Sequence, residues 1–277
     1  MPSRQSLPSV TLCCVDTRHA DQAWYALERC VTRFAFKGSV FFCPEGWQPS
    51  GTDLPDITLH PVPPLQGIKG YNRFMLSDLA SHVTTSHALV VQWDGFVCCP
   101  EYWDASFLDW DYIGAPWYHG GSHGSVGNGG FSLRSKKLLS ALETLNHPAN
   151  EPEDMAICVT LRPMLEAKFG IRFAPLEVAQ RFACEYGPYR PSFGFHGMHN
   201  FAHVMNHHAL QMWLDKCPAD ILLSKPSRKL AKALMRNGRV DEARDLLRRR
   251  IKLGGLDMDH LRLLFRSLAY GLRNMKR

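Results

Sequence analysis

The sequence predicts an α/β fold with a largely parallel sheet, followed by a C-terminal helical extension. Short β-rich runs alternate with segments whose apolar residues recur at helical spacing, as in consecutive βαβ units. The run 88–92 is almost wholly apolar, which is typical of a central strand that is covered on both faces. From about Ala202 onward, the apolar spacing is helical.

The elements of the first half can be placed in order. We expect strands at 10–15, 39–43, 57–62 and 88–92, and helices at 19–34 and from Tyr71 to about Val83. Ligands of such sheets bind beyond the carboxyl ends of the strands. The candidate site therefore includes Asp16-Thr17-Arg18 and Trp93-Asp94-Gly95, and neither segment contains the glycine fingerprint of a dinucleotide fold or a P-loop.

The second half begins with a loop rich in glycine and aromatic residues, at 112–134, which we expect to lie on the surface and to end in a short strand. A helix is expected at 135–145. Pro152-Glu153-Asp154 opens another helix, with acidic residues in the first turn, where the helix dipole favours them. A strand-like segment follows at 173–177.

The composition excludes a disordered chain, because 45% of the residues are apolar and 21% are charged. No run approaches the roughly 18 apolar residues of a membrane-spanning helix, and the polar start at 1–9 is unlike a secretory signal. The nine cysteines include no CxxC pair, which argues against a structural zinc ribbon. We therefore expect a reduced, cytoplasmic protein.

The charge is distributed unevenly along the chain. Residues 224–277 hold 16 Lys and Arg against 5 Asp and Glu, a net charge of +11, whereas residues 1–223 hold 16 against 21, a net charge of −5. Such a basic tail can meet nucleic acid, an anionic membrane surface or an acidic partner, or it can form a solvated helical face.

The tail also has a recognisable helical pattern. Residues 229–253 predict two antiparallel helices that turn at Asn237-Gly238, similar to half of a tetratricopeptide-type repeat. One such unit cannot form a solenoid, so we expect it to pack as a helical cap. The predicted domains are 1–208 and 209–277.

Six segments occur in an order that resembles the GT-A class of nucleotide-sugar glycosyltransferases, in particular a bacterial family of glycosyltransferase-like domains. The segments are the strand ending at Asp16, Val-Val-Gln-Trp-Asp94-Gly, Tyr-Ile-Gly-Ala-Pro-Trp117, Gly-Asn-Gly-Gly-Phe-Ser-Leu-Arg134, Pro-Glu-Asp154 and Phe-Gly-Phe-His196-Gly. The resemblance covers residues 10–204. It implies a GT-A-like, Rossmann-type mixed sheet, mainly parallel and flanked by helices.

The resemblance also implies a reaction. A sugar would move from a nucleotide-sugar donor, with a UDP-sugar favoured, to a glycan or lipid-linked acceptor in bacterial cell-surface polysaccharide synthesis. The departing phosphates of such a donor need positive charge, which a divalent cation or basic side chains can supply. The basic tail would then dock the enzyme peripherally at the inner face of an anionic membrane.

In this class, an Asp-x-Asp segment after a central strand and a downstream histidine hold Mn²⁺ or Mg²⁺. Asp94 and His196 match these two places, whereas Gln92 stands where the first Asp is expected. The alternative is that Asp94 only forms a turn and that His196 is a hydrogen-bonded, half-buried histidine.

The resemblance gives an acidic residue at the Pro-Glu-Asp segment the role of general base in inverting enzymes. We expect Asp154 to be this base, with Glu153 as the alternate. The alternative for one of the two is a helix N-terminal capping role.

Further residues are expected to bind the donor. They are Asp16, Thr17 and Arg18 after the first strand, Lys69, Asn72 and Arg73 at a helix start, Asn128, Gly129 and Gly130 in the glycine run, and Trp117 as a stacking platform. The alternatives are that the charged residues are only solvated, that the glycines form a hinge and that Trp117 packs in the core.

Three histidines, at 199, 203 and 207, follow i, i+4, i+8 spacing, so on one helix their imidazoles would share a face. Helical His pairs can bind zinc, but a polar surface is the simpler interpretation. Two other functions remain open. One is a catalytically silent carbohydrate- or partner-binding module, and the other is nucleic-acid binding by the tail, for which no motif is present.

Overall fold

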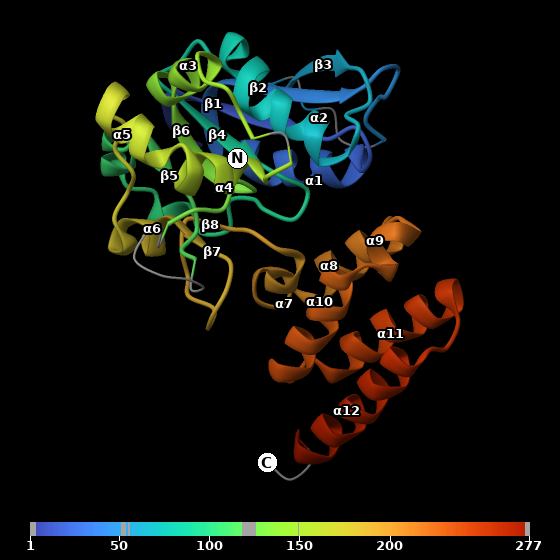
Figure 1. Cartoon of the computed structure of the whole chain (residues 1–277). Helices are drawn as coiled ribbons and strands as arrows, with labels where there is room; N and C mark the ends of the chain where they lie inside the picture. Colours follow the sequence, from blue (N-terminus) through green and yellow to red (C-terminus); the bar gives the residue numbers. More distant parts are fainter. Residues whose placement is uncertain (1–3, 51–53, 55, 118–125, 149, 275–277) are drawn as a thin grey trace. The chain divides into compact units, whose positions relative to one another are not determined.

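The computed structural model describes residues 4–50, 54, 56–117, 126–148 and 150–274 (Figure 1). Contacts divide the chain into two units, Met1–His196 and Gly197–Arg277. The division lies earlier than the predicted boundary at 208/209. The reason is that a 3₁₀ turn at Met198–Asn200 and α7 (Phe201–Val204) pack against α10 (Lys225–Arg236) of the helical unit.

The first unit is built on a mixed six-stranded sheet in the order β3-β2-β1-β4-β6-β5. The strands are β1 (Gln5–Val15), β2 (Phe34–Pro44), β3 (Thr58–Val62), β4 (His87–Val91), β5 (Tyr112–Ile113) and β6 (Phe131–Ser135). The first four strands are parallel to one another, and β6 runs antiparallel to both β4 and β5. All five residues of β4 are buried, as expected for a central strand.

Helices cover both faces of this sheet. The helices are α1 (Ala20–Val31), α2 (Gly67–Arg73), α3 (Lys136–Glu143), α4 (Glu153–Met155), α5 (Arg162–Phe169) and α6 (Leu176–Phe182). On one face, Cys13, Phe42 and Val90 pack against Phe74 and Leu139. The predicted mixed, mainly parallel sheet with flanking helices and a C-terminal helical extension is thereby confirmed.

Several expected elements differ. The loop expected on the surface at 112–134 is instead buried throughout its described residues, apart from the half-buried Trp117, and the helix expected at 19–34 ends at Val31 because Phe34 begins β2.

The helix expected at 71–83 begins earlier, at Gly67, which has a φ of 61°, and continues as a π-helical turn (Phe74–Asp78) and a 3₁₀ turn (Leu79–His82). The strand expected at 173–177 is wrong beyond a single bridge from Phe173 to Tyr112. Pro175 has the fixed φ that suits the start of a helix, and α6 begins at the next residue, so the strand cannot continue.

The C-terminal unit is helical, as predicted. It contains α8 (His207–Asp215), α9 (Ala219–Leu223), α10, α11 (Val240–Gly254) and α12 (Met258–Asn274). The turn predicted at Asn237-Gly238 separates α10 from α11, and Gly238 supplies the positive φ of 77° that this turn requires.

The expectation that His199, His203 and His207 share one face of a single helix is wrong. The chain leaves helical geometry after α7, and Asn206 caps α8 by accepting a hydrogen bond from the backbone N–H of Ala209 at 2.9 Å. His203 instead contacts Asn237, and His207 lies 3.1 Å from Glu242. All nine cysteines are free thiols. Within the described residues, no helix has the length and apolarity needed to cross a bilayer.

Burial of His87 at the start of β4 predicts a pH-dependent stability. Its ring lies 3.0 Å from Ser86 Oγ and 3.2 Å from the carbonyl oxygen of Trp110, and burial lowers the pKa of the imidazole from 6.5. The unfolded chain therefore binds this proton more readily than the folded chain. The stability that neutral His87 contributes is present above about pH 6.5 and is lost as the pH falls below it.

We expect His87→Gln to lower the unfolding free energy by about 1 kcal/mol near neutral pH, because hydrogen bonds are lost. Glutamine does not titrate. The difference in unfolding free energy between the two proteins should therefore shrink at a pH about one unit below 6.5, the ordinary pKa of histidine. Urea unfolding of both proteins at the two pH values measures it. A difference that stays constant or grows toward acid would contradict this interpretation.

Candidate functional site

A cavity of about 320 Å³ opens at the carboxyl ends of β1 and β4. Its lining comes from the loop after β1, from α2 with the segment before it, and from the end of β4. The lining residues are Val15, Asp16, Thr17, Arg18, His19, Leu65, Gly67, Ile68, Tyr71, Gln92 and Trp93. This is the edge of the sheet at which the sequence placed the site.

The expected donor residues after β1 line this cavity and also hold its wall in place. Asp16 Oδ1 accepts hydrogen bonds from the backbone N–H groups of Arg18 and His19, at 2.8 and 2.7 Å. Thr17 Oγ1 accepts one from the backbone N–H of Leu65 at 3.0 Å. The Asp16 carboxylate therefore forms an Asx turn, and it faces the cavity from there.

The expected residues on α2 are placed differently. Lys69 and Arg73 are exposed and do not line the cavity, whereas Asn72 is buried and donates to the carbonyl of Glu151. Ile68 and Tyr71 of the same helix line the cavity instead. Because α2 begins at Gly67 rather than near Tyr71, the helix presents these two side chains to the cavity.

The structure brings Asp94 and His196 together, as the resemblance implies. Asp94 Oδ1 lies 3.2 Å from Nε2 of His196, and both side chains are largely buried. On the other side of the ring, Nδ1 lies 3.2 Å from Glu185 Oε1. Burial disfavours the imidazolium, but the carboxylates of Asp94 and Glu185 outweigh this and hold the pKa of His196 well above its usual value.

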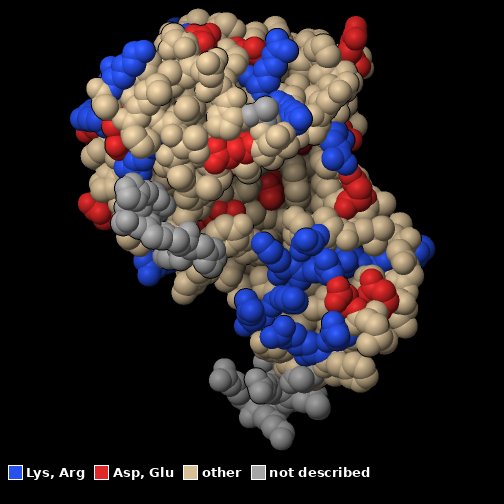
Figure 2. All heavy atoms as spheres, viewed as in Figure 1, with Lys and Arg blue, Asp and Glu red and all other residues tan. Residues whose placement is uncertain are grey.

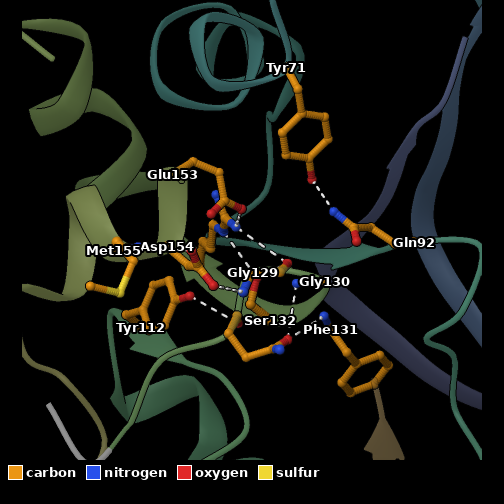
Figure 3. A network of polar contacts seen from close by, with 12 residues as sticks. Tyr71, Gln92, Tyr112, Gly129, Gly130, Phe131, Ser132, Glu153, Asp154 and Met155 are labelled. Atoms are coloured by element: carbon orange, nitrogen blue, oxygen red, sulfur yellow. Dashed lines mark hydrogen bonds and ion pairs between the residues drawn. The ribbon is translucent and has the colours of Figure 1, made fainter. Parts of the chain in front are cut away.

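Gln92 links this pair to the cavity. Its Oε1 lies 3.3 Å from His196 Nε2, and its Nε2 donates to the hydroxyl of Tyr71 at 2.6 Å. Figure 3 shows the Tyr71 hydroxyl directed at the Gln92 amide. Burial raises the pKa of Tyr71 well beyond its ordinary value, so the hydroxyl stays protonated.

Asp94, Gln92 and His196 bring two oxygen atoms and one nitrogen atom close together. In the described residues, no group of three or more His, Cys, Asp or Glu side chains is arranged to hold a metal. However, Asp94 Oδ1 and Gln92 Oε1 each lie within 3.3 Å of His196 Nε2. Neighbouring ligands of an octahedral ion with bonds of about 2.1 Å are separated by about 3 Å, and such ions prefer oxygen ligands.

The glycine run lets other side chains approach closely. A Cβ on Gly129 would lie 1.9 Å from Glu153 Oε1, and one on Gly130 would lie 2.2 Å from His196 Nε2. Asn128 has a φ of 62°, and its Oδ1 accepts from the backbone N–H groups of Gly130 and Phe131 at 3.1 and 3.3 Å. The side chain of Asn128 therefore shapes the turn that makes room for Glu153 and His196.

Glu153 and Asp154 have different environments at the start of α4. Glu153 is buried and pairs with Arg134 of β6, from Nη2 to Oε1 at 2.7 Å. Burial raises the pKa of Glu153, and the guanidinium opposes this. Asp154 is half-buried, and its Oδ2 accepts from the backbone N–H of Gly129 at 3.3 Å (Figure 3).

Trp117, the expected stacking platform, does not line the cavity of about 320 Å³. Its ring is half-buried against the core formed by α3, α5 and their neighbours, and a Cβ on Gly127 would lie 2.2 Å from it. These contacts favour the packing role. The middle of the loop that follows, 118–125, lies outside the described residues.

Sequence reasoning missed His19, Leu65 and Ile68 of the cavity, and also two charged residues near Asp94 and Asp154. Glu185 follows the short strand β7 (Ala183–Cys184), and besides contacting His196 it accepts from Asn128 Nδ2 at 2.5 Å. Arg134 is fully buried, with hydrogen bonds from its guanidinium to Ser132 and Glu153. An acidic residue directly after a short apolar run, as in Phe-Ala-Cys-Glu185, was the available signal.

Most of the site lies within a segment that defines a protein family. Residues 56–196 match the family described as "Protein of unknown function (DUF5672)", which spans half of the chain. The chain belongs to this family. No curated protein matches the sequence of the chain.

Several solved structures of glycosyltransferases are similar to this chain. One is involved in the glycosylation of the major capsid of PBCV-1, with 14% identity, a TM-score of 0.44, and coverage of 68% of this chain and 92% of that one. Galactosyltransferase LgtC has 12% identity, a TM-score of 0.41, and coverage of 67% and 86%. Mannosyltransferase PcManGT from Pyrobaculum calidifontis, in complex with GDP-Man and Mn²⁺, has 14% identity, a TM-score of 0.38, and coverage of 98% and 81%.

The close approach at Gly130 predicts a specific cost of substitution. We expect Gly130→Ala to lower the unfolding free energy by about 1–3 kcal/mol, because the new methyl group must displace His196 or the backbone. Gly38→Ala in β2 is the matched control, since its Cβ would meet nothing within 4 Å, and its effect should stay within about 1 kcal/mol. Urea unfolding of the two variants measures this, and equal effects would show that the site tolerates the methyl group.

Proposed function

We propose that this protein is a GT-A-like glycosyltransferase that moves a sugar from a nucleotide-sugar donor to a glycan or lipid-linked acceptor. One observation carries the proposal. Asp94 after β4 and the distant His196 meet beside Gln92, which lines the cavity at the carboxyl edge of the sheet. A pocket next to a carboxylate and an imidazole suits a ligand that carries a diphosphate and a cation.

We propose that the cavity receives the nucleoside part of the donor. Its volume of about 320 Å³ lies in the usual range for small-ligand sites. Its lining offers the Asp16 carboxylate, the Arg18 guanidinium, and the rings of His19 and Trp93, whose centroids are 6.1 Å apart. Aromatic faces suit a base, and carboxylate oxygens suit ribose hydroxyls. We favour a UDP-sugar, as the resemblance implies.

Asp94, His196 and Gln92 are the side chains that would hold Mn²⁺ or Mg²⁺. Their spacing and their oxygen and nitrogen donors support this assignment. Such an ion, when bound, neutralises the charge that develops on the departing diphosphate. The chain's own residues contribute differently: Asp94 and Gln92 orient His196 from one side, and Glu185 orients it from the other.

Of the two acidic residues at α4, we propose Asp154 as the general base. Glu153 is committed to the buried guanidinium of Arg134, so it serves the structure. Asp154 is half-buried and accepts a hydrogen bond from the backbone N–H of Gly129. The next residue, Gly130, lies against His196. As the acceptor oxygen bonds to the anomeric carbon, its proton passes to Asp154 and the bond to the diphosphate breaks. This displacement inverts the anomeric centre.

Donor turnover tests the proposal. With UDP-sugars, Asp154→Asn should lower turnover about 10²–10⁴-fold while leaving donor binding in place. Asp94→Asn and EDTA should each abolish the stimulation by Mn²⁺. Asp78→Asn, an exposed residue of the π-helical turn, is the matched control and should behave as wild type. Release of nucleoside diphosphate, followed by a coupled assay, measures all four.

Two outcomes would contradict the proposal. The first is donor binding without turnover by the wild-type protein, which would indicate a carbohydrate-binding module on the same fold. This module is the second candidate function, and it is favoured by the neutral Gln92, which stands in place of an acidic residue. Equal turnover in wild type, Asp94→Asn and Asp154→Asn would show that the reaction occurs elsewhere.

Glu185 is proposed as a positioning residue, because its carboxylate contacts the face of His196 that lies away from Asp94. We expect Glu185→Ala to raise the Mn²⁺ concentration that half-saturates turnover by about 10–100-fold, as is typical of such indirect partners. Glu185→Gln, which keeps an oxygen that accepts from Nδ1–H, should restore much of this. Glu177→Ala, at an exposed position of α6, is the control, and an unchanged Mn²⁺ response in Glu185→Ala would remove the role.

A further inference from the structure

The last helix, α12, packs one face inside its own unit and exposes apolar side chains on the other face. Leu263 and Ser267 are buried on the face that packs against α10 and α11. On the opposite face, Met258, Phe265 and Leu268 are between 55% and 70% exposed. Residues 258, 265 and 268 fall on one side of an α-helix, so these side chains form a continuous outward stripe, which we call the α12 stripe.

The surroundings of the α12 stripe extend its apolar character. Leu253 at the end of α11 and Leu256 in the following turn are also about half exposed. Monomeric proteins seldom expose apolar side chains contiguously without a binding role. The α12 stripe is therefore a candidate binding surface.

The helical unit as a whole is basic, although Asp257 and Asp259 accompany Arg262 and Arg266 around the start of α12. Arg262 and Arg266, one turn apart on α12, are both exposed and lie along one side of the stripe, and Arg262 Nη1 also lies 3.7 Å from Asp259 Oδ1. In the view of Figure 2, Lys and Arg side chains gather over one side of the helical unit. Residues 224–277 carry a net charge of +11, so the helical unit as a whole attracts an anionic surface and repels a second copy of itself.

We propose that the α12 stripe docks on an anionic lipid bilayer, with Phe265 and Leu268 inserted between headgroups and Arg262 and Arg266 against the lipid phosphates. Amphipathic helices that lie in the membrane interface combine Phe and Leu with flanking Arg in this way. Juxtamembrane basic residues add attraction to anionic lipids, which salt screens. This docking goes beyond the transfer reaction and does not depend on it.

Sedimentation of the full chain with vesicles tests the proposal. The wild-type protein should bind phosphatidylcholine vesicles that contain phosphatidylglycerol, and should bind pure phosphatidylcholine much more weakly. Phe265→Ala/Leu268→Ala should lower the partition coefficient about ten-fold or more. Arg262→Gln/Arg266→Gln should lower it about five-fold per charge at low salt, and should reduce its dependence on salt.

Matched controls separate the α12 stripe from general stickiness. Met212→Ala removes an exposed apolar side chain on α8, and Lys37→Gln/Arg190→Gln removes two exposed charges from the first unit, so both should bind as wild type. All substituted side chains are exposed, so melting temperatures should not change. No donor is needed, so this test and the test of transfer succeed or fail separately.

Three results would overturn the proposal. The first is a wild-type protein that does not bind vesicles containing phosphatidylglycerol. The second is binding that Phe265→Ala/Leu268→Ala leaves unchanged. The third is a dimer in analytical ultracentrifugation that the same double substitution dissociates, because a second copy would then cover the stripe.

Discussion

The buried ion pair between Arg134 and Glu153 is the constraint on which the site depends. The Arg134 guanidinium has no exposed surface and lies on β6, beside the edge strand β5. It is tolerated only with a partner, because removing one partner of a buried ion pair costs about 3–5 kcal/mol. Glu153 is that partner, and it fixes the start of α4 at the edge of β6. Asp154, the next residue, is thereby placed beside Gly129.

The same constraint explains the glycine run. For Glu153 to reach Arg134 and for His196 to reach Asp94, both side chains must pass where a Cβ at 129 or 130 would stand. The turn at Asn128 therefore forms a backbone wall against which the side chains of Glu153 and His196 pack. His196 lies between Asp94 and Glu185, so the electrostatics of the site depend on three carboxylates held around one imidazole and one guanidinium.

The sequence predicted the parallel strands and the pairing of Asp94 with His196 because apolar runs and motif order carry that information. It could not predict which side of α2 faces the cavity, since the phase of a short helix depends on where Gly67 begins it. Lys69 and Arg73 consequently face solvent. Glu185 was missed because its position depends on a two-residue strand pair, which leaves no periodic pattern. The α12 stripe also required the structure, because periodicity cannot show which face of this helix is covered.

The proposed transfer first requires that a nucleoside diphosphate binds in the cavity beside Asp94 and His196. The most direct measurement is the shift in melting temperature with UDP, GDP, CMP or dTDP, each with Mn²⁺ or EDTA, because a ligand of the folded state raises the melting temperature by mass action. We predict stabilisation by UDP that requires Mn²⁺ and disappears in Asp94→Asn. No stabilisation by any nucleotide under either condition would contradict the account.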